Sequence, residues 1–178
     1  MIMSPQECNE LLLKLRDPNQ FAHLIRIPEN EPVYEIDLSK REIDAPAYLS
    51  VEEDQNAEII WFKVDRFYDN IDLYSGVAWI QYINADKEER LYAAPFLVGT
   101  EQFGNEQILI PWAIGKDVTK APGTIQFSFQ FFKLSEDSQR FLYILNTQPS
   151  SSKVLNGMHV DPFSFIEEES ENEAWIRD

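Results

Sequence analysis

Alternating apolar and polar residues run through the middle of the chain and predict β-strands. The clearest case is the segment 124–134, in which apolar side chains at every second position alternate with polar ones. One face of this strand should be buried and the other exposed. Strand-like patterns also occur at 33–38, 58–64, 77–83, 91–98, 108–112 and 141–147.

Turn-forming residues separate these segments, and no helical periodicity lies between them. Because parallel sheets need helical crossovers, the pattern predicts an all-β fold, an antiparallel β-sandwich of about seven or eight strands over residues 33–157. A flattened barrel is the alternative. Pro95 and Pro111 fall inside two of the segments. Since proline cannot donate to a strand ladder, we expect edge strands or strand ends there.

Residues 1–32 follow a different pattern. Ser4, Pro5 and Glu7 occupy the N-cap, the first helical position and the third position after the cap, which is typical of a helix start. An apolar stripe then follows at helical spacing, made of Cys8, Leu11, Leu12 and Leu15. We expect a short amphipathic helix that ends before Pro18, then an extended proline-rich arm. The stripe packs either on its own domain or on a neighbouring subunit.

Residues 158–178 form an acidic segment that also contains aromatic residues. From Glu167 onward there are six acidic residues and one basic residue, a density of like charge typical of a solvated tail. Phe163, Phe165, Trp175 and Ile176 add large apolar side chains, which a solvated tail does not need. The alternative is a tail that becomes ordered against another chain. These four residues and the helical stripe are therefore the candidate partner-binding residues.

The charge balance narrows the range of partners. The 178 residues include 15 Lys and Arg against 31 Asp and Glu, a net charge of −16, and no basic run is longer than Lys40-Arg41. Nucleic acids and anionic membranes bind clustered positive charge, so we expect neither as a partner. The apolar runs are also shorter than the ~20 residues that span a bilayer. Without a targeting signal, we expect a protein made and kept, or assembled, in a cytoplasm.

Motifs for catalysis or metal binding are absent from the sequence. His23 and His159 are the only histidines, and neither has a second ligand at metal-binding spacing. Phosphate-binding loops, dinucleotide fingerprints and nucleophile elbows are missing too. The single cysteine rules out a disulfide framework within the chain. We therefore expect no metal, no cofactor and no enzymatic activity, although a glycosidase carboxylate pair needs no sequence motif and stays an alternative.

A cluster of carboxylates in the segment 65–72 has two interpretations. Asp65, Asp69 and Asp72 could offer oxygen ligands to Ca²⁺. Their spacing differs from that of the EF-hand loop, which needs ligands at alternate positions around a glycine. We therefore expect a loop salt-bridged around Arg66 instead.

The middle of the chain resembles a module of phage structural proteins. The segments that carry the resemblance are Asn56–Asp69, Asp72-Leu73, Trp79–Ala85, Ile110–Trp112, Gly123–Phe129 and Leu145–Met158. In their pattern of apolar and aromatic positions, residues 36–158 are similar to the N-terminal attachment domain of upper baseplate and tail-fibre proteins. Those proteins belong to tailed bacteriophages of Gram-positive hosts, and the module is a β-sandwich.

This resemblance implies a non-enzymatic virion structural protein that anchors to other phage proteins. We expect an assembly or adaptor subunit of the tail, baseplate or capsid-fibre region, present as a homo-oligomer within a symmetric assembly. It would be assembled in the host cytoplasm and located in the virion. Two alternatives stay open: a capsid decoration protein, and a carbohydrate-binding module that stacks host surface glycans on exposed aromatics such as Tyr68, Tyr74 and Trp79.

Overall fold

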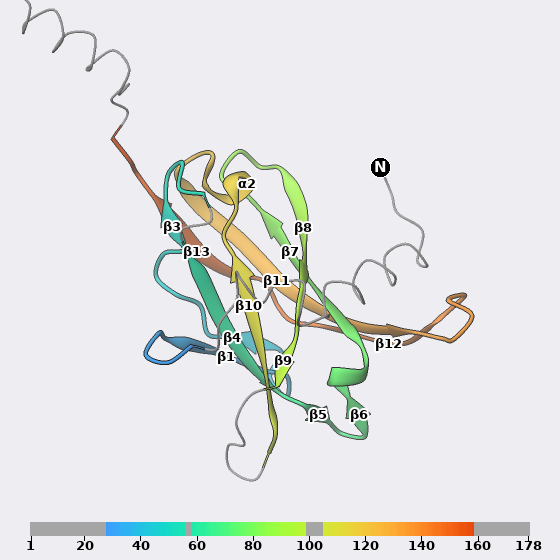
Figure 1. Ribbon diagram of the computed structural model, residues 1–178. Coiled ribbons are helices and arrows are strands. Elements are labelled where there is room, and N and C mark those ends of the chain that lie inside the picture. The colour runs from blue at the N-terminus through green and yellow to red at the C-terminus, as the bar shows by residue number, and fades with distance from the viewer. Residues whose placement is uncertain (1–27, 56–57, 99–104, 159–178) are drawn as a thin grey trace, which may run out of the picture.

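Two β-sheets pack face to face in the computed structural model, which describes residues 28–55, 58–98 and 105–158 (Figure 1). Sheet I has the strand order β2 (Glu42–Ile43), β1 (Val33–Asp37), β4 (Ile59–Asp65), β10 (Gln107–Ala113) and β9 (Leu97–Val98). Sheet II has the order β3 (Ser50–Val51), β13 (Ser150–Leu155), β11 (Gly123–Leu134), β7 (Val77–Ile83) and β8 (Glu89–Ala94). The predicted all-β sandwich is confirmed.

The twelve-residue strand β11 is the spine of sheet II. It pairs with β7 along one side. On its other side it pairs with β13 in its first half and with β12 (Phe141–Asn146) in its second half. Two successive strands of the chain therefore share one edge of β11.

Four short elements lie outside the two sheets. They are the two-residue hairpin of β5 (Phe67–Tyr68) and β6 (Ile71–Asp72), the 3-10 turn η1 (Leu73–Ser75) and the single-turn helix α2 (Lys116–Thr119). None of the helices in this part of the chain has the length and apolarity needed to span a bilayer.

Two strand pairings differ from the antiparallel prediction. β1 runs parallel to β4, and β3 runs parallel to β13. Parallel neighbours need a long connection. Between β1 and β4 the chain provides one, because it passes through β2 in sheet I and β3 in sheet II before it returns.

Both prolines lie where a ladder bond is not required. Pro95 ends β8, and the chain then crosses from sheet II to β9 in sheet I, so the predicted strand 91–98 is two strands. Pro111 lies within β10 opposite Trp61. Among the described residues, β9 pairs with β10 only at Ile108 and Leu109, so the far side of β10 has no ladder at Pro111. The prediction of an edge or a strand end is confirmed for Pro95, which directly follows β8. For Pro111 it is wrong, because β10 lies between β4 and β9 in sheet I and lacks a neighbour on its far side only locally.

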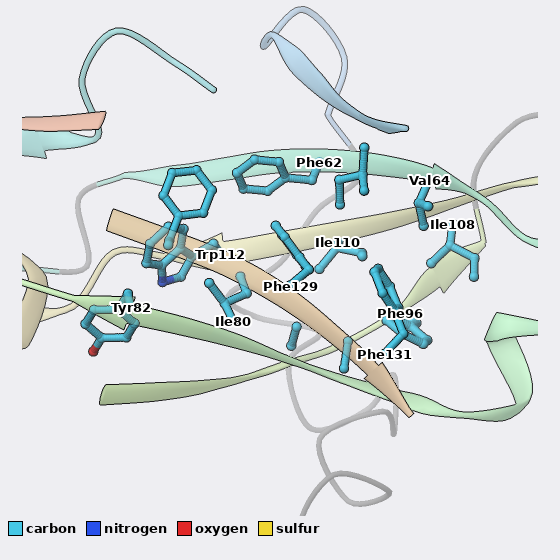
Figure 2. Close-up of a cluster of buried hydrophobic side chains, with 14 of the residues drawn as sticks. Phe62, Val64, Ile80, Tyr82, Phe96, Ile108, Ile110, Trp112, Phe129 and Phe131 are labelled. Carbon is cyan, nitrogen blue, oxygen red and sulfur yellow. The ribbon is translucent and has the colours of Figure 1, made fainter. Parts of the chain in front are cut away.

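Aromatic rings fill the space between the two sheets. Figure 2 shows Phe62 on β4 facing Phe129 on β11, and their ring centroids lie 5.0 Å apart. The ring centroids of Trp112 on β10 and Phe127 on β11 lie 5.3 Å apart. The apolar residues of the predicted alternation, Ile125, Phe127, Phe129 and Phe131, are all buried. Each such side chain contributes about 1.5–3 kcal/mol through the hydrophobic effect.

Candidate protein-interaction surface

The structure leaves the predicted partner-binding residues unplaced. Those of the helical stripe (Cys8, Leu11, Leu12 and Leu15) and those of the acidic tail (Phe163, Phe165, Trp175 and Ile176) all lie outside the described residues. Their role stays a prediction. The described residues point to a different surface, the face of sheet II that is turned away from sheet I.

A second hydrophobic cluster lies on this outer face. Because side chains alternate along a strand, the neighbours of the core residues on β7 and β11 point away from sheet I. Four of these outward side chains, here called the outer cluster, pack together: Val77, Trp79, Phe132 and Leu134. The rings of Trp79 and Phe132 lie 6.1 Å apart. The outer face is therefore apolar at this end of the sheet.

Strand β12 extends the apolar surface to the edge of the sheet. Its residues Phe141, Leu142 and Ile144, here called the β12 edge, are 48%, 51% and 44% exposed. Ile144 lies opposite Phe132 in the ladder, and the ring of Phe141 meets that of Phe132 edge-on at 5.6 Å. The outer cluster and the β12 edge are thus one continuous surface.

The backbone of β12 is open on one side. In the part of the chain that the structure describes, β12 pairs with β11 and with no other strand. An edge strand of this kind offers unpaired N–H and C=O groups to a strand from another chain. Open backbone groups and half-exposed apolar side chains occur together here, which is the arrangement that binds an added strand.

Sequence reasoning predicted the strand at 141–147 but missed its role. A signal was present, because Phe141 to Leu145 is an unbroken apolar run. In a strand with one solvent-exposed face, apolar and polar residues alternate, as they do in β11. In a strand whose two faces are both buried, they do not. The lack of alternation indicated a second buried or buriable face.

An open groove of about 770 Å³ lies over β7, β8 and the first half of β11. Its lining is mixed: it includes the polar Gln81, Gln126 and Ser128, the charged Glu89 and Arg90, and the apolar Ile83, Leu91 and Pro149. Tyr82 also borders the groove but is only 8% exposed, because its ring packs in the core against Trp112. The groove therefore offers aliphatic surface together with amide, hydroxyl and charged groups, and little aromatic surface.

The aromatic residues considered for glycan stacking are engaged with other side chains. Trp79 is 8% exposed within the outer cluster. The ring of Tyr74 lies 6.4 Å from that of Phe96 and 5.3 Å from the guanidinium of Arg66. Tyr68 lies 5.5 Å from the guanidinium of Arg41. These contacts occupy ring faces that a sugar would need for stacking.

Arg66 forms an ion pair with Asp72 across the segment 65–72, and the predicted salt-bridged loop is confirmed at this carboxylate, whereas Asp65 accepts from the side-chain amide of Gln107. The Nε and Nη2 of Arg66 donate to the two oxygens of Asp72 at 2.9 and 3.0 Å, and its Nη1 donates to Glu106 at 2.7 Å. The hydrogen bonds from Arg66 hold the pKa of Asp72 below its ordinary value. Residues 28–55, 58–98 and 105–158 contain no group of three or more His, Cys, Asp or Glu residues placed to hold a metal ion.

A second hollow, of about 460 Å³, lies between β8 and β10 at the side of the sandwich. Tyr82, Tyr92 and Trp112 line it, and the backbone N–H of Ala113 donates to the hydroxyl of Tyr92 at 3.2 Å. Burial raises the pKa of Tyr82 to about 12 and also raises that of Tyr92. Both hydroxyls therefore stay neutral at physiological pH.

Comparisons with known proteins add no assignment to this geometry. No protein-family model matches the chain, and a search of curated proteins finds no match.

Proposed function

We propose that the chain is a non-enzymatic structural protein of a bacteriophage virion that works through protein–protein contacts. It acts as an assembly or adaptor subunit of the tail, baseplate or capsid-fibre region. The observation that carries the assembly role is the β12 edge, where three half-exposed apolar side chains border an open strand. The resemblance of residues 36–158 to phage attachment modules supports the virion as the place of assembly.

The energetics of the β12 edge favour a protein partner. Covering the half-exposed side chains of Phe141, Leu142 and Ile144 would contribute roughly 1 kcal/mol each through the hydrophobic effect. A partner strand would add backbone hydrogen bonds. If that partner is a second copy, two β12 strands pair antiparallel about a twofold axis, which gives the symmetric homo-oligomer expected for such a subunit.

The net negative charge of the chain also favours the β12 edge as the contact surface. With a net charge of −16, copies of the chain repel one another over most of their surfaces. β12 itself, Phe-Leu-Tyr-Ile-Leu-Asn, contains no charged residue. Association should therefore occur at this neutral strand, because contact elsewhere would bring like charges together.

Quantitative mass spectrometry of purified phage particles tests the proposal. The abundance of the chain is normalised to the major capsid subunit, for the wild type and for the variants Leu142→Lys and Ile144→Lys. Leu155→Lys is the matched control, because Leu155 is 39% exposed in the same sheet but lies on β13. We expect incorporation of the wild type and the control, and at least a tenfold loss for both β12 variants.

The same measurement separates the possible sites in the virion. A ratio close to that of the capsid subunit would indicate a capsid decoration protein, and a small ratio shared with tail proteins would indicate the tail or baseplate. Absence of the wild-type chain from intact particles would overturn the virion role. Equal incorporation of all four chains would overturn the role of the β12 edge.

A further inference from the structure

A second strand of sheet II is open on one side. In the part of the chain that the structure describes, β8 pairs with β7 and with no other strand, so β8 and β12 lie at opposite edges of the β11–β7 pair. Leu91 of β8 is 56% exposed and borders the open groove of the outer face. Sheet II therefore has an edge besides β12 to which another strand can be added.

A hydrogen bond at the turn between β7 and β8 shows which backbone groups of β8 face this open side. The N–H of Asn84 donates to the carbonyl of Glu88 at 3.1 Å. The direction of the backbone groups alternates along an antiparallel strand, and the ladder between β7 and β8 continues from this turn without a shift. Leu91 and Ala93 therefore point their N–H and C=O groups away from β7.

The same alternation defines the open groups of β12. The N–H of Thr147 donates to the carbonyl of Phe129 on β11 at 3.0 Å. Counted back along the ladder, Leu142 and Ile144 point their N–H and C=O groups away from β11. Each of the two edge strands therefore offers a pair of alternate residues, with the same spacing, to a partner.

We infer that β12 of one copy of the chain pairs antiparallel with β8 of a second copy. This partner rests on the proposed assembly role of the β12 edge. Leu142 then lies opposite Ala93, and Ile144 lies opposite Leu91, so the open groups of each residue bond those of its opposite. All of these side chains are on the outer face of sheet II, so apolar residues meet apolar residues across the contact.

The strand directions suit a second copy in the same orientation. β12 and β7 both run antiparallel to β11, and β8 runs antiparallel to β7. β12 and β8 therefore run in opposite directions within one chain. A copy placed beside the first in the same orientation presents its β12 antiparallel to β8, with both outer faces on the same side. Such a head-to-tail contact repeats from copy to copy and generates a ring or a helical array.

Charges at the end of β12 favour β8 over a second β12 strand. Nη1 of Arg41 donates to the carbonyl of Asn146 at 2.9 Å, so this guanidinium lies on the open side of β12. In the pairing with β8, Asn146 lies next to the exposed Glu89 of the second copy, which attracts Arg41. Two β12 strands paired about a twofold axis at Tyr143 would instead bring Arg41 next to the exposed Arg140 of the other copy and would leave β8 unpaired.

Light scattering of the purified full-length chain over a range of concentrations tests the inference. Leu91→Lys places a charge at the edge of β8, and Ile144→Lys places one at the β12 edge. Leu155→Lys, on β13 of the same sheet, is the control. The wild type and the control should associate beyond a dimer, and each edge variant alone should associate at least tenfold more weakly.

An equimolar mixture of the two edge variants should form a one-to-one heterodimer, because one intact β12 then meets one intact β8. Self-association of Leu91→Lys at the wild-type level would overturn the inference, since two β12 strands would then pair with each other. A mixture of Leu91→Lys and Ile144→Lys that forms no heterodimer would overturn it, as would a wild-type chain that stays monomeric at millimolar concentration.

Disulfide trapping tests the register. In a Cys8→Ser background, a Leu91→Cys chain is mixed with an Ile144→Cys chain, oxidised and analysed by non-reducing gels and intact mass. The control mixture contains Leu155→Cys and Ile144→Cys. We expect the mixed dimer of the first pair to form at least tenfold faster than that of the control. Equal rates would overturn the register.

These experiments use no phage, so their failure and that of the proposed function can be told apart. A monomeric chain whose β12 variants still fail to enter particles would overturn the inference alone, and another protein would then occupy the β12 edge. A chain that associates head to tail but is absent from particles would support the inference and overturn the virion role.

Discussion

Thr147 satisfies both backbone groups of Phe129. Its N–H donates to the carbonyl of Phe129 at 3.0 Å, and its Oγ1 accepts from the N–H of Phe129 at 2.9 Å. Phe129 lies between the stretch of β11 that pairs with β13 and the stretch that pairs with β12. Thr147 therefore closes the gap between two ladders, at a site where Thr147 itself is only 6% exposed.

Replacing Thr147 with valine should destabilise the fold by about 1–3 kcal/mol. The shape is kept, but the buried N–H of Phe129 loses its acceptor, and an unsatisfied buried donor is costly. Urea denaturation measures the change in the free energy of unfolding. Thr124→Val, at an exposed position of the same strand β11, is the control and should change stability little. Equal stabilities of the two variants would contradict the role given to Thr147.

Gly76→Ala should be destabilising because the residue has no room for a side chain. A Cβ at this position would overlap the hydroxyl of Tyr143 and lie 2.5 Å from the carbonyl oxygen of Phe132. Such overpacking costs about 1–3 kcal/mol. Gly115→Ala is the matched control, since a Cβ there would meet nothing within 4 Å. Thermal denaturation of both variants checks the prediction, which fails if Gly76→Ala melts with the control.

Stability should fall in alkaline solution as buried tyrosines ionise. Burial raises the pKa of Tyr82 to about 12, above the ordinary value of about 10. Between these values the unfolded chain has released the proton that the folded chain still holds, so unfolding becomes more favourable as pH rises. The contribution of Tyr82 is complete below pH about 10 and is lost as pH approaches 12.

Absorbance titration of the phenolate and denaturation between pH about 9 and 12 check this prediction. In Tyr82→Phe the fall of stability with pH should be shallower. Replacing Tyr48, which is 54% exposed, should leave the slope unchanged and serves as the control. A slope identical in all three chains would show that Tyr82 does not carry the effect.

Arg66 and Asp72 should be energetically coupled. The ion pair is bidentate and about one-third exposed, so a double-mutant cycle with alanine should give a small favourable coupling energy at neutral pH. The pKa of Asp72 is lowered by Arg66. The stabilisation is therefore present above the ordinary aspartate pKa of about 4 and is lost as pH falls through the lower value of the folded chain.

Urea denaturation of the four chains of the cycle measures this coupling at neutral and at acidic pH. The coupling should shrink under acidic conditions, in which Asp72 is protonated. A coupling energy near zero at neutral pH would mean that the loop is held by its backbone alone.

Most of the sandwich could be predicted from the sequence because its central strands carry their own signal. The alternation of apolar and polar residues from Ile125 to Phe131 indicates one buried face, and all four of its apolar residues lie in the core. β13 was missed because Ser-Ser-Ser-Lys-Val-Leu has low intrinsic strand propensity. Its conformation depends on pairing with β11, and pairing between distant segments leaves no local pattern.

The interaction surface was harder to predict than the fold. Sequence patterns drew attention to the terminal segments, where apolar residues stand among polar ones. Phe141 to Leu145 looked like ordinary core material, because composition cannot tell which face of a strand the second sheet covers. Only the pairing of β12 with the far half of β11 shows that Ile144 points away from the core.

The sharing of β11 by β12 and β13 has a mechanical consequence. A partner held at the β12 edge and the chain that leaves after Met158 lie toward opposite ends of β11. Tension between them would run along the strands and perpendicular to their hydrogen bonds. The bonds would bear the load together in shear instead of opening one after another. Sheet II is therefore suited to transmit force between two neighbours without coming apart.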